Sequence, residues 1–428
     1  MKKLLQLKLK ILSQLILKKY QPKVIGITGS VGKTTTKEAV YAVLKDKFKV
    51  RRNIKNYNNE IGLPLTIIGV ESPGKNLFGW LGVFWKAVFM ILIKDKDYPE
   101  VLILEMGIDR PGDMMYLNEI ANPSIAIVTA VGNVHLEYFG SRKKLQKEKA
   151  DLVRVVPKEG LVVLNFDNEL VREMKKDSRA KVVTFGMDPG ADLNCSESRF
   201  SFEGGGSLQG ISFKIKYNGS TVPFLIPGVI GFNSIYAAMA AIAVATNFGM
   251  NMVEIASRLK EFRSPQGRMN LLKGIKNTSI IDDTYNSEPV SCVAGLDVLG
   301  KFAVNVGAKK FAVLGDMLEL GQESVERHRE IGEKVKSAGV NVLITVGERS
   351  RDIDHGAIEA GMKTDNVFHF NNSEEAGLFV QEKIRQGDLI FVKGSQGVRM
   401  EKVVKEIMAE PLRAEELLVR QDKEWGNK

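Results

Sequence analysis

Cysteine is scarce in this sequence, and internal repeats and low-complexity tracts are missing. Among 428 residues only Cys195 and Cys292 occur, which argues against a disulfide framework and is compatible with a reducing cytosol. Hydrophobic residues make up 44% of the chain and charged residues 26%, as is usual for globular proteins. Because an average domain has about 150 residues, the length predicts two or three domains.

Acidic residues are outnumbered, since 61 basic and 51 acidic side chains give a net charge of +10. This excess suits an anionic partner such as a nucleotide, a nucleic acid or a membrane surface, without choosing among them. No nucleic-acid-binding motif accompanies the charge, so no nucleic-acid partner is expected.

Apolar runs bounded by turn residues alternate with helical patterns along most of the chain. Runs such as KVIGITG, VLILEMG, LVVLNFD, KKFAVLGDM and DLIFVKGS are typical of buried strands. This alternation predicts an α/β protein with mainly parallel sheets. Residues 193–227 alternate instead as β-hairpins do, an alanine-rich helix is expected at 234–247, and residues 264–270 read as a linker between domains.

The segment ITGSVGKTTT, residues 27–36, joins a predicted strand to a predicted helix. Its glycines permit a tight turn, and the free N–H groups and dipole of the helix would hold a phosphate. Lys33 would reach the terminal phosphates of a nucleotide, and Thr34 would bind Mg²⁺. The general pattern G-x-x-x-x-G-K-[ST] asks for glycine at Ile27, so the match is incomplete, and a plain glycine turn is the alternative.

No signal peptide is expected at the N-terminus, MKKLLQLKLKILSQLILKKY, because lysines interrupt its apolar run and no cleavage site follows. On a helix, Leu4, Ile11 and Leu15 would join residues 5, 9, 12 and 16 in one broad apolar face. Two interpretations stay open. The favoured one docks this helix on its own domain, and the other lays it on a membrane surface.

A second apolar segment, NLFGWLGVFWKAVFMILI at residues 76–93, is at the short limit for a membrane span. A spanning helix here would leave the phosphate loop and the following strand on opposite sides of a bilayer. We therefore expect an apolar insertion that packs against the N-terminal helix and touches a membrane at most from one side.

Several polar residues gain interest from their places in the pattern. Glu105 ends an apolar strand, where a carboxylate either holds Mg²⁺ or lies on the surface. His135 follows the next strand and is more often structural than a ligand at such a place. Lys149 sits in a helical pattern, where a solvated lysine is the ordinary expectation. Asp282 and Asp283 end the first strand of the second half, as a turn or a cap.

Taken in order, these motifs resemble the Mur ligase family. The resemblance spans roughly residues 22–410 and is carried by ITGSVGKTTTKEAV, NYNNEIGLPLTII, VLILEMG, NVHLEYFGS, KADLV, GRMN, IIDDTYNSEP, VLGDMLELG and FVKGSQG. The family has a shortened loop, G-[TS]-x-G-K-[TS], which residues 29–34 fit, so Ile27 is expected. NYNNEIGLPLT and GDMLELG point to the members that add D-alanyl-D-alanine to a muramoyl tripeptide.

The resemblance implies a P-loop ATPase domain at 22–265 and a Rossmann-like α/β domain at 266–428. The apolar patterns add a basic amphipathic helix at 1–21 and an insertion at 72–98 within the first domain. It also implies that ATP phosphorylates the carboxylate of a peptide-bearing cell-wall precursor, and that the amine of D-alanyl-D-alanine then attacks the acyl phosphate. A cytoplasmic monomer is expected, with residues 1–20 and 76–93 as the parts that would contact the inner face of the membrane.

Site residues follow from the resemblance by position. The residues implied for ATP are Gly29, Ser30, Val31, Gly32, Lys33, Thr34, Thr35, Asn233, Arg268 and Asp283. Two Mg²⁺ ions are implied, held by Thr34, Glu105, His135 and a carbamylated Lys149. The residues implied in catalysis are Lys33, His135, Lys149 and Arg268. Those implied for the peptide and the incoming dipeptide are Asn58, Asn59, Asp316, Glu319, Lys393 and Ser395.

The sequence also departs from the family. Family members carry an N-terminal domain of about a hundred residues that grips the UDP end of the substrate, whereas the phosphate-loop strand begins here near Lys23, so that domain is expected to be absent. The segment GFNSIYAAMAA has Phe232, Asn233 and Tyr236 where the family has a histidine–asparagine pair and a second asparagine, which leaves the adenine contact open.

Two further functions remain as alternatives to ligation of D-alanyl-D-alanine. One is the same chemistry on another carboxylate, either lipid-linked or without UDP, and the other is an idle nucleotide-binding member of the family. Intact Lys33, Thr34, Glu105, His135 and Lys149 favour an active enzyme.

Overall fold

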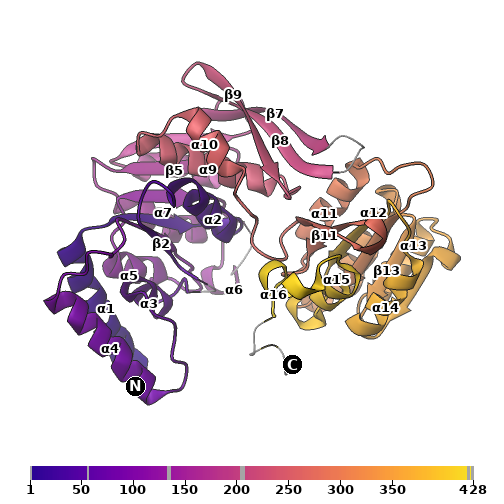
Figure 1. The fold of residues 1–428 in the computed structure, drawn as a ribbon, viewed down its shortest axis with the longest axis horizontal. Helices are drawn as coiled ribbons and strands as arrows, with labels where there is room; N and C mark the ends of the chain where they lie inside the picture. The colour runs from indigo at the N-terminus through magenta and orange to yellow at the C-terminus, as the bar shows by residue number, and fades with distance from the viewer. Residues whose placement is uncertain (1, 55–56, 133–135, 203–207, 422–424, 426–428) are drawn as a thin grey trace. The chain divides into compact units, whose positions relative to one another are not determined.

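The computed structural model describes residues 2–54, 57–132, 136–202, 208–421 and 425, and the chain divides into two compact units (Figure 1). The first unit comprises Met1–Arg199, Ser212–Pro227 and Phe232–Arg263. The second comprises Phe200–Ile211, Gly228–Gly231 and Ser264–Lys428. Both are built from a sheet with helices beside it, so the predicted α/β class is confirmed.

Within the described residues, the first unit is organised by a nine-stranded sheet. Its strands, in sheet order, are β2 (Val50–Arg52), β3 (Val101–Glu105), β1 (Lys23–Thr28), β4 (Ile125–Val128), β5 (Leu161–Asn165), β6 (Lys181–Gly186), β7 (Leu193–Phe202), β8 (Leu208–Tyr217) and β9 (Ser220–Pro227). Every pairing from β2 to β7 is parallel. The carboxyl ends of β1, β3, β4, β5 and β6 therefore meet at one edge of the sheet.

Helices cover both faces of this sheet, because the side chains of a strand alternate between its faces. Leu102 and Leu104 belong to a cluster with helices on one face, whereas Ile103 is buried on the other. The helices of the first unit are α1 (Lys2–Tyr20), α2 (Lys33–Leu44), α3 (Gly62–Ile68), α4 (Leu77–Leu92), α5 (Asp113–Ile120), α6 (Leu136–Phe139), α7 (Arg142–Arg154), α8 (Glu169–Arg172), α9 (Asn233–Asn247) and α10 (Met252–Leu259).

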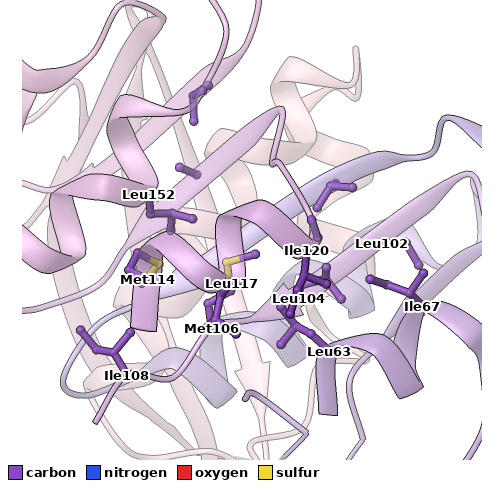
Figure 2. Close-up of a cluster of buried hydrophobic side chains, with 14 of the residues drawn as sticks. Leu63, Ile67, Leu102, Leu104, Met106, Ile108, Met114, Leu117, Ile120 and Leu152 are labelled. Atoms are coloured by element: carbon purple, nitrogen blue, oxygen red, sulfur yellow. The ribbon is translucent and has the colours of Figure 1, made fainter. Parts of the chain in front are cut away.

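A single apolar cluster joins β3 to the helices of its face. Figure 2 shows side chains of α3, β3, α5 and α7 meeting there, among them Leu63, Ile67, Leu104, Leu117 and Leu152. Dense apolar burial of this kind supplies most of the stability of a domain. The cluster also includes residues of α1 and α4, so both N-terminal apolar segments belong to the core of the first unit.

Helix α1 docks on its own unit, which confirms the favoured interpretation, but the predicted single apolar face is wrong. Leu9 and Ile16 are fully buried, whereas Leu4, Ile11 and Leu15 are exposed to solvent. With 3.6 residues per turn, the two sets lie on opposite sides of the helix. The apolar residues therefore form two stripes, of which only one is covered.

The apolar insertion folds as α4 and packs against α1, as predicted. The Lys19 ammonium donates to the carbonyls of Met90 and Ile91 at 3.0 and 2.9 Å, and the Tyr20 hydroxyl donates to Met90 at 3.0 Å. These carbonyls lie in the last turn of α4, where they have no partner within the helix and attract a cation. Among the described residues, no helix is long and apolar enough to cross a membrane.

The second unit contains, over its described residues, a six-stranded sheet in which only β10 is antiparallel. Its strands in sheet order are β10 (Asn270–Lys273), β11 (Ser279–Asp283), β15 (Leu389–Lys393), β12 (Lys310–Gly315), β13 (Val342–Val346) and β14 (Val367–Phe370). Its helices are α11 (Pro289–Lys301), α12 (Ser324–Ser337), α13 (Arg351–Glu359), α14 (Ser373–Lys383), α15 (Glu401–Ile407) and α16 (Ala414–Leu417).

We expect the docking of α1 to contribute to the stability of the first unit. Leu9→Ala would lower the free energy of unfolding by about 2–5 kcal/mol, because it leaves a cavity in the core. Leu7→Ala, on the exposed side of the same helix, would change it by about 0.5 kcal/mol or less. Denaturant unfolding followed by circular dichroism measures both, and equal effects of the two substitutions would show that α1 is not docked.

Candidate active site

The segment between β1 and α2 forms a turn that only glycine can make. Gly29 and Gly32 have φ of 151° and 85°. A Cβ added to Gly29 would lie 1.9 Å from the hydroxyl of Thr129 and 3.0 Å from the amide nitrogen of Ala130. The Ser30 amide donates to the Ala130 carbonyl at 2.8 Å. The loop is therefore pressed onto the chain just after β4.

Lys33 begins α2 and folds back over this loop. Its ammonium donates to the Gly29 carbonyl at 2.8 Å, so the charge lies beside the turn whose backbone would face a phosphate. Ser30 holds the other side of the loop, because its hydroxyl accepts from the Gly132 amide at 2.9 Å. The N–H groups at the start of α2, together with this cation, make an anion site.

Glu105 lies at the carboxyl end of β3, next to the start of α2. The Thr34 hydroxyl donates to one carboxylate oxygen of Glu105 at 3.0 Å, and the Asn58 amide donates to the other at 3.3 Å. Asn53 holds the backbone of Glu105 by two hydrogen bonds of 2.7 and 3.0 Å. A buried carboxylate beside a threonine hydroxyl is the oxygen donor set that Mg²⁺ prefers.

Lys149 is not the solvated lysine that its helical pattern predicts, because only 2% of it is exposed. Burial in α7 lowers the pKa of its amine to about 7, and the positive charge of Lys33 adds to the lowering. Glu148 and Asp109 oppose the shift. An amine with this pKa is largely neutral at the pH of a cell, and a neutral amine is a nucleophile. His135 lies outside the described residues.

A cavity of about 280 Å³ opens beside the phosphate loop. Asp167 and Tyr236 meet in its wall, where the Tyr236 hydroxyl donates to a carboxylate oxygen of Asp167 at 2.7 Å. Burial and this neighbouring carboxylate raise the pKa of the Tyr236 hydroxyl. The remaining residues that line the cavity are Val31, Gly32, Thr36, Thr129, Ala130, Asn165, Asn168, Phe185, Asn233 and Ala237.

The predicted residues Asn233 and Val31 are thus placed beside a polar pocket that the sequence did not reveal. Asp167 and Thr129 were missed as candidates. Thr129 directly follows the parallel strand β4, and Asp167 is the second residue after β5. Ligands bind at the carboxyl ends of strands in sheets of this type. This place after a strand is the feature of the sequence from which both residues could have been predicted. Asn59 instead caps α3, since its side chain accepts from the amides of Ile61 and Gly62 at 3.1 and 2.9 Å.

In the second unit, Asp283 and Lys393 form a buried ion pair. The Lys393 ammonium lies 2.6 Å from a carboxylate oxygen of Asp283 and also donates to the Asn286 carbonyl at 2.8 Å. The other oxygen of Asp283 accepts from the Met269 amide at 3.2 Å. The Thr284 hydroxyl donates to a carboxylate oxygen of the neighbouring Asp282 at 2.6 Å. Burial raises the pKa of Asp282 to about 6.

The loops after β12 and β15 meet at the same edge of the second sheet. Ser395 donates from its amide to the Asp316 carbonyl at 2.9 Å, and its hydroxyl accepts from the Leu318 amide at 2.9 Å. Glu319 follows in the exposed part of this loop with a φ of 65°. The structure therefore brings Asp316, Lys393 and Ser395 together with Glu319 beside them.

Arg268 lies in the second unit over the ring of Tyr285, with its guanidinium carbon 4.0 Å from the ring centroid. Within the described part of the chain, its buried Nε has no hydrogen-bond partner. A buried guanidinium nitrogen that lacks a partner is costly, which suits a residue whose role is to bind an anion.

Comparisons with known proteins agree with this geometry. The model of the Mur ligase middle domain matches residues 27–77 and 88–245, and that of the Mur ligase glutamate ligase domain matches residues 267–396. The UDP-N-acetylmuramoyl-tripeptide–D-alanyl-D-alanine ligase of Bacillus subtilis is 30% identical over 94% of this chain and 79% of its own length. The chain belongs to the Mur ligase family.

Solved Mur ligases share the fold over nearly the whole chain. MurF ligase of Thermotoga maritima, solved in complex with ADP, has a TM-score of 0.73 at 27% identity and is covered over 83% of its chain and 94% of this one. MurF of Acinetobacter baumannii has a TM-score of 0.76 at 23% identity, over 79% and 93% of the two chains. This Mur ligase is an ATP-dependent enzyme that forms C–N bonds.

The expected absence of a domain that grips UDP remains a prediction. The family models match a middle and a C-terminal domain, which fits the expected absence of a domain that grips UDP but does not establish it. The middle-domain match leaves out residues 78–87, which lie within α4.

The close approach at Gly29 gives a direct test of the phosphate loop. Gly29→Ala would weaken ATP binding more than about tenfold, because the new methyl group displaces the loop from Thr129. Gly82→Ala is the matched control, since a Cβ at that exposed glycine meets no atom within 4 Å. Isothermal titration calorimetry measures both affinities, and wild-type affinity of Gly29→Ala would contradict the assignment.

Proposed function

We propose that this Mur ligase joins D-alanyl-D-alanine to the free carboxylate of a UDP-N-acetylmuramoyl tripeptide in the cytoplasm, acting as a monomer. The single observation behind this choice of substrates is the 30% identity to ligases of that activity over 94% of the chain. The phosphate loop, Glu105 and the buried Lys149 are the groups that the chemistry requires.

The reaction runs in two steps. An oxygen of the peptide carboxylate attacks the γ-phosphorus of ATP, and ADP leaves. The amine of the dipeptide then attacks the acyl carbon, phosphate leaves, and the nitrogen loses a proton. Both steps bring anions together, so catalysis depends on positive charge placed in advance. We assign this charge to Lys33 and the N–H groups of residues 29–35.

Thr34 and Glu105 are the residues proposed to hold one Mg²⁺, and His135 and Lys149 a second. When bound, Mg²⁺ would neutralise the phosphates and orient them for attack. The described residues include no group of three His, Cys, Asp or Glu side chains that could hold a metal. Modification of Lys149 would add a carboxylate-like donor to the site.

Carbamylation of Lys149 joins its neutral amine to CO₂, forms an N–C bond and releases a proton. Only the neutral amine reacts, and burial favours this form by lowering the pKa to about 7. The product is an anion beside the Lys33 ammonium. The carbamate would therefore be attracted to Lys33, whereas a protonated Lys149 would be repelled by it.

Residues of the second unit are proposed to contact the nucleotide and the incoming dipeptide. Arg268 and Asp283 would contact the nucleotide, and Asp316, Glu319, Lys393 and Ser395 the incoming dipeptide. The ion pair of Lys393 with Asp283 ties these two sets together. Asn58, which donates to Glu105, and Asn59 are proposed to lie on the side of the muramoyl peptide. The cavity beside the phosphate loop is proposed to bind adenine, with Tyr236, bonded to Asp167, at the position of the family's second asparagine.

Phosphate release from ATP tests the proposed substrates. With UDP-N-acetylmuramoyl tripeptide present, release should require D-alanyl-D-alanine and fall to background when glutamate replaces it, and mass spectrometry should detect the pentapeptide product. Stimulation by glutamate alone would assign another substrate. An enzyme that stays silent with every amine would be an idle family member.

Lys149→Ala should lower kcat by about 10³-fold, because it removes a group that organises charge at the reaction centre. Short carboxylic acids should restore part of the activity by entering the space left by the side chain. Lys147→Ala, at an exposed position of the same helix, is the control and should keep wild-type kcat.

The same model has a pH signature, since the Lys149 ammonium predominates below about pH 7. Wild-type activity should fall below that pH. It should also fall in buffer freed of CO₂, and added bicarbonate should restore the activity lost by removal of CO₂. Full activity of Lys149→Ala, or activity independent of CO₂, would contradict the carbamate.

A further inference from the structure

Helices α1 and α4 lie side by side at one end of the first unit and leave apolar side chains uncovered (Figure 1). Phe78 is 84% exposed and Trp85 75% exposed, which is unusual for aromatic side chains of a soluble domain. We call the uncovered set the outer face. Its members are Leu4, Leu7, Ile11, Leu15, Leu77, Phe78, Leu81, Trp85, Val88, Phe89, Leu92 and Ile93.

The two helices turn the same side away from the protein. Leu9 and Ile16 of α1 and Val83, Ala87 and Met90 of α4 are buried in one cluster. The exposed residues lie opposite these positions on each helix, so both exposed stripes look away from the same core. The bonds from Lys19 and Tyr20 to the last turn of α4 hold the helices together. The outer face is therefore made of two neighbouring exposed stripes on helices that pack together.

The outer face is apolar along its middle and basic around its border. Residues 1–20 contain six lysines and no acidic residue, and residues 71–97 contain four lysines against Glu71, Asp95 and Asp97. The two segments together therefore carry an excess of lysine. Lys3, Lys8, Lys18, Lys75 and Lys94 are exposed. Lysine stems can cover apolar surface while their ammonium groups reach outward. This arrangement suits a partner that is apolar inside and anionic at its surface.

We propose that the outer face docks on the surface of an anionic lipid bilayer. Aromatic and aliphatic side chains would enter the boundary between headgroups and acyl chains, and the lysines would pair with anionic headgroups. Tryptophan favours that boundary. Neither helix is long and apolar enough to span the membrane, so the contact is interfacial.

Two other observations favour this occupant. A second copy of the chain would bring the same excess of lysines against itself, which disfavours self-association. Residues 78–87, which include Phe78 and Trp85, fall outside the family-model match. The outer face is thus an addition to the common domain rather than part of its core.

Co-sedimentation of the full chain with vesicles tests the proposal. Binding to vesicles that contain phosphatidylglycerol should exceed binding to pure phosphatidylcholine vesicles and should weaken as salt is raised. The pair Phe78→Ser and Trp85→Ser should lower the partition coefficient more than about tenfold. The pair Val253→Ser and Val290→Ser, at exposed valines elsewhere, should bind as the wild type does.

Charge reversal separates the two contributions. The pair Lys3→Glu and Lys18→Glu should lower binding to anionic vesicles about tenfold or more, and should change binding to neutral vesicles little. Ligase activity in vesicle-free buffer should be unchanged in all three pairs, because none of these residues lies at the proposed active site. Failure of the ligase assay would leave this binding test intact.

Three results would overturn the proposal. The first is a wild-type chain that does not sediment with anionic vesicles. The second is equal binding by the wild type and by the Phe78→Ser and Trp85→Ser pair. The third is a dimer in analytical ultracentrifugation that this pair converts to a monomer, which would assign the outer face to a second copy of the chain.

Discussion

The parallel pairing of β1 with β3 and β4 is the constraint on which the candidate site depends. Because all three strands run the same way, the phosphate loop, Glu105 and the chain after β4 emerge at one edge. The register places Ile27 beside Glu105, so the carboxylate lies within reach of the first turn of α2. Gly29 can press against Thr129 only because glycine has no Cβ, since an added Cβ would lie 1.9 Å from the Thr129 hydroxyl.

Burial gives this edge its chemical character. Glu105 keeps a carboxylate in a nearly closed environment through Thr34, Asn58 and the backbone bonds of Asn53. Lys149 lies in a similarly closed place, and the loss of water lowers its pKa. Burial thus favours the neutral form of the Lys149 amine. Sites that join such perturbed groups are where catalysis is usually found.

The N-terminal segments show how one apolar pattern can serve two purposes. Leu9 and Ile16 stabilise the first unit, and Leu4 and Ile11 on the same helix face away from it. Helix α4 is similarly divided between Val83 and Trp85. Apolar residues on the exposed side add nothing to the core, so their presence calls for a partner outside the chain.

The sequence by itself determined the alternation of strands and helices, the phosphate loop and the carboxylate at the end of β3, because these features follow from local periodicity and turn chemistry. The short edge strands β2 and β10 were not predicted, because three or four half-buried residues are too few to show a strand periodicity. The burial of Lys149, the pairing of Asp167 with Tyr236 and the split of α1 into two stripes were decided only by tertiary structure. Each of them depends on which distant segments cover a side chain, and exclusion of water by such neighbours leaves no trace in local sequence.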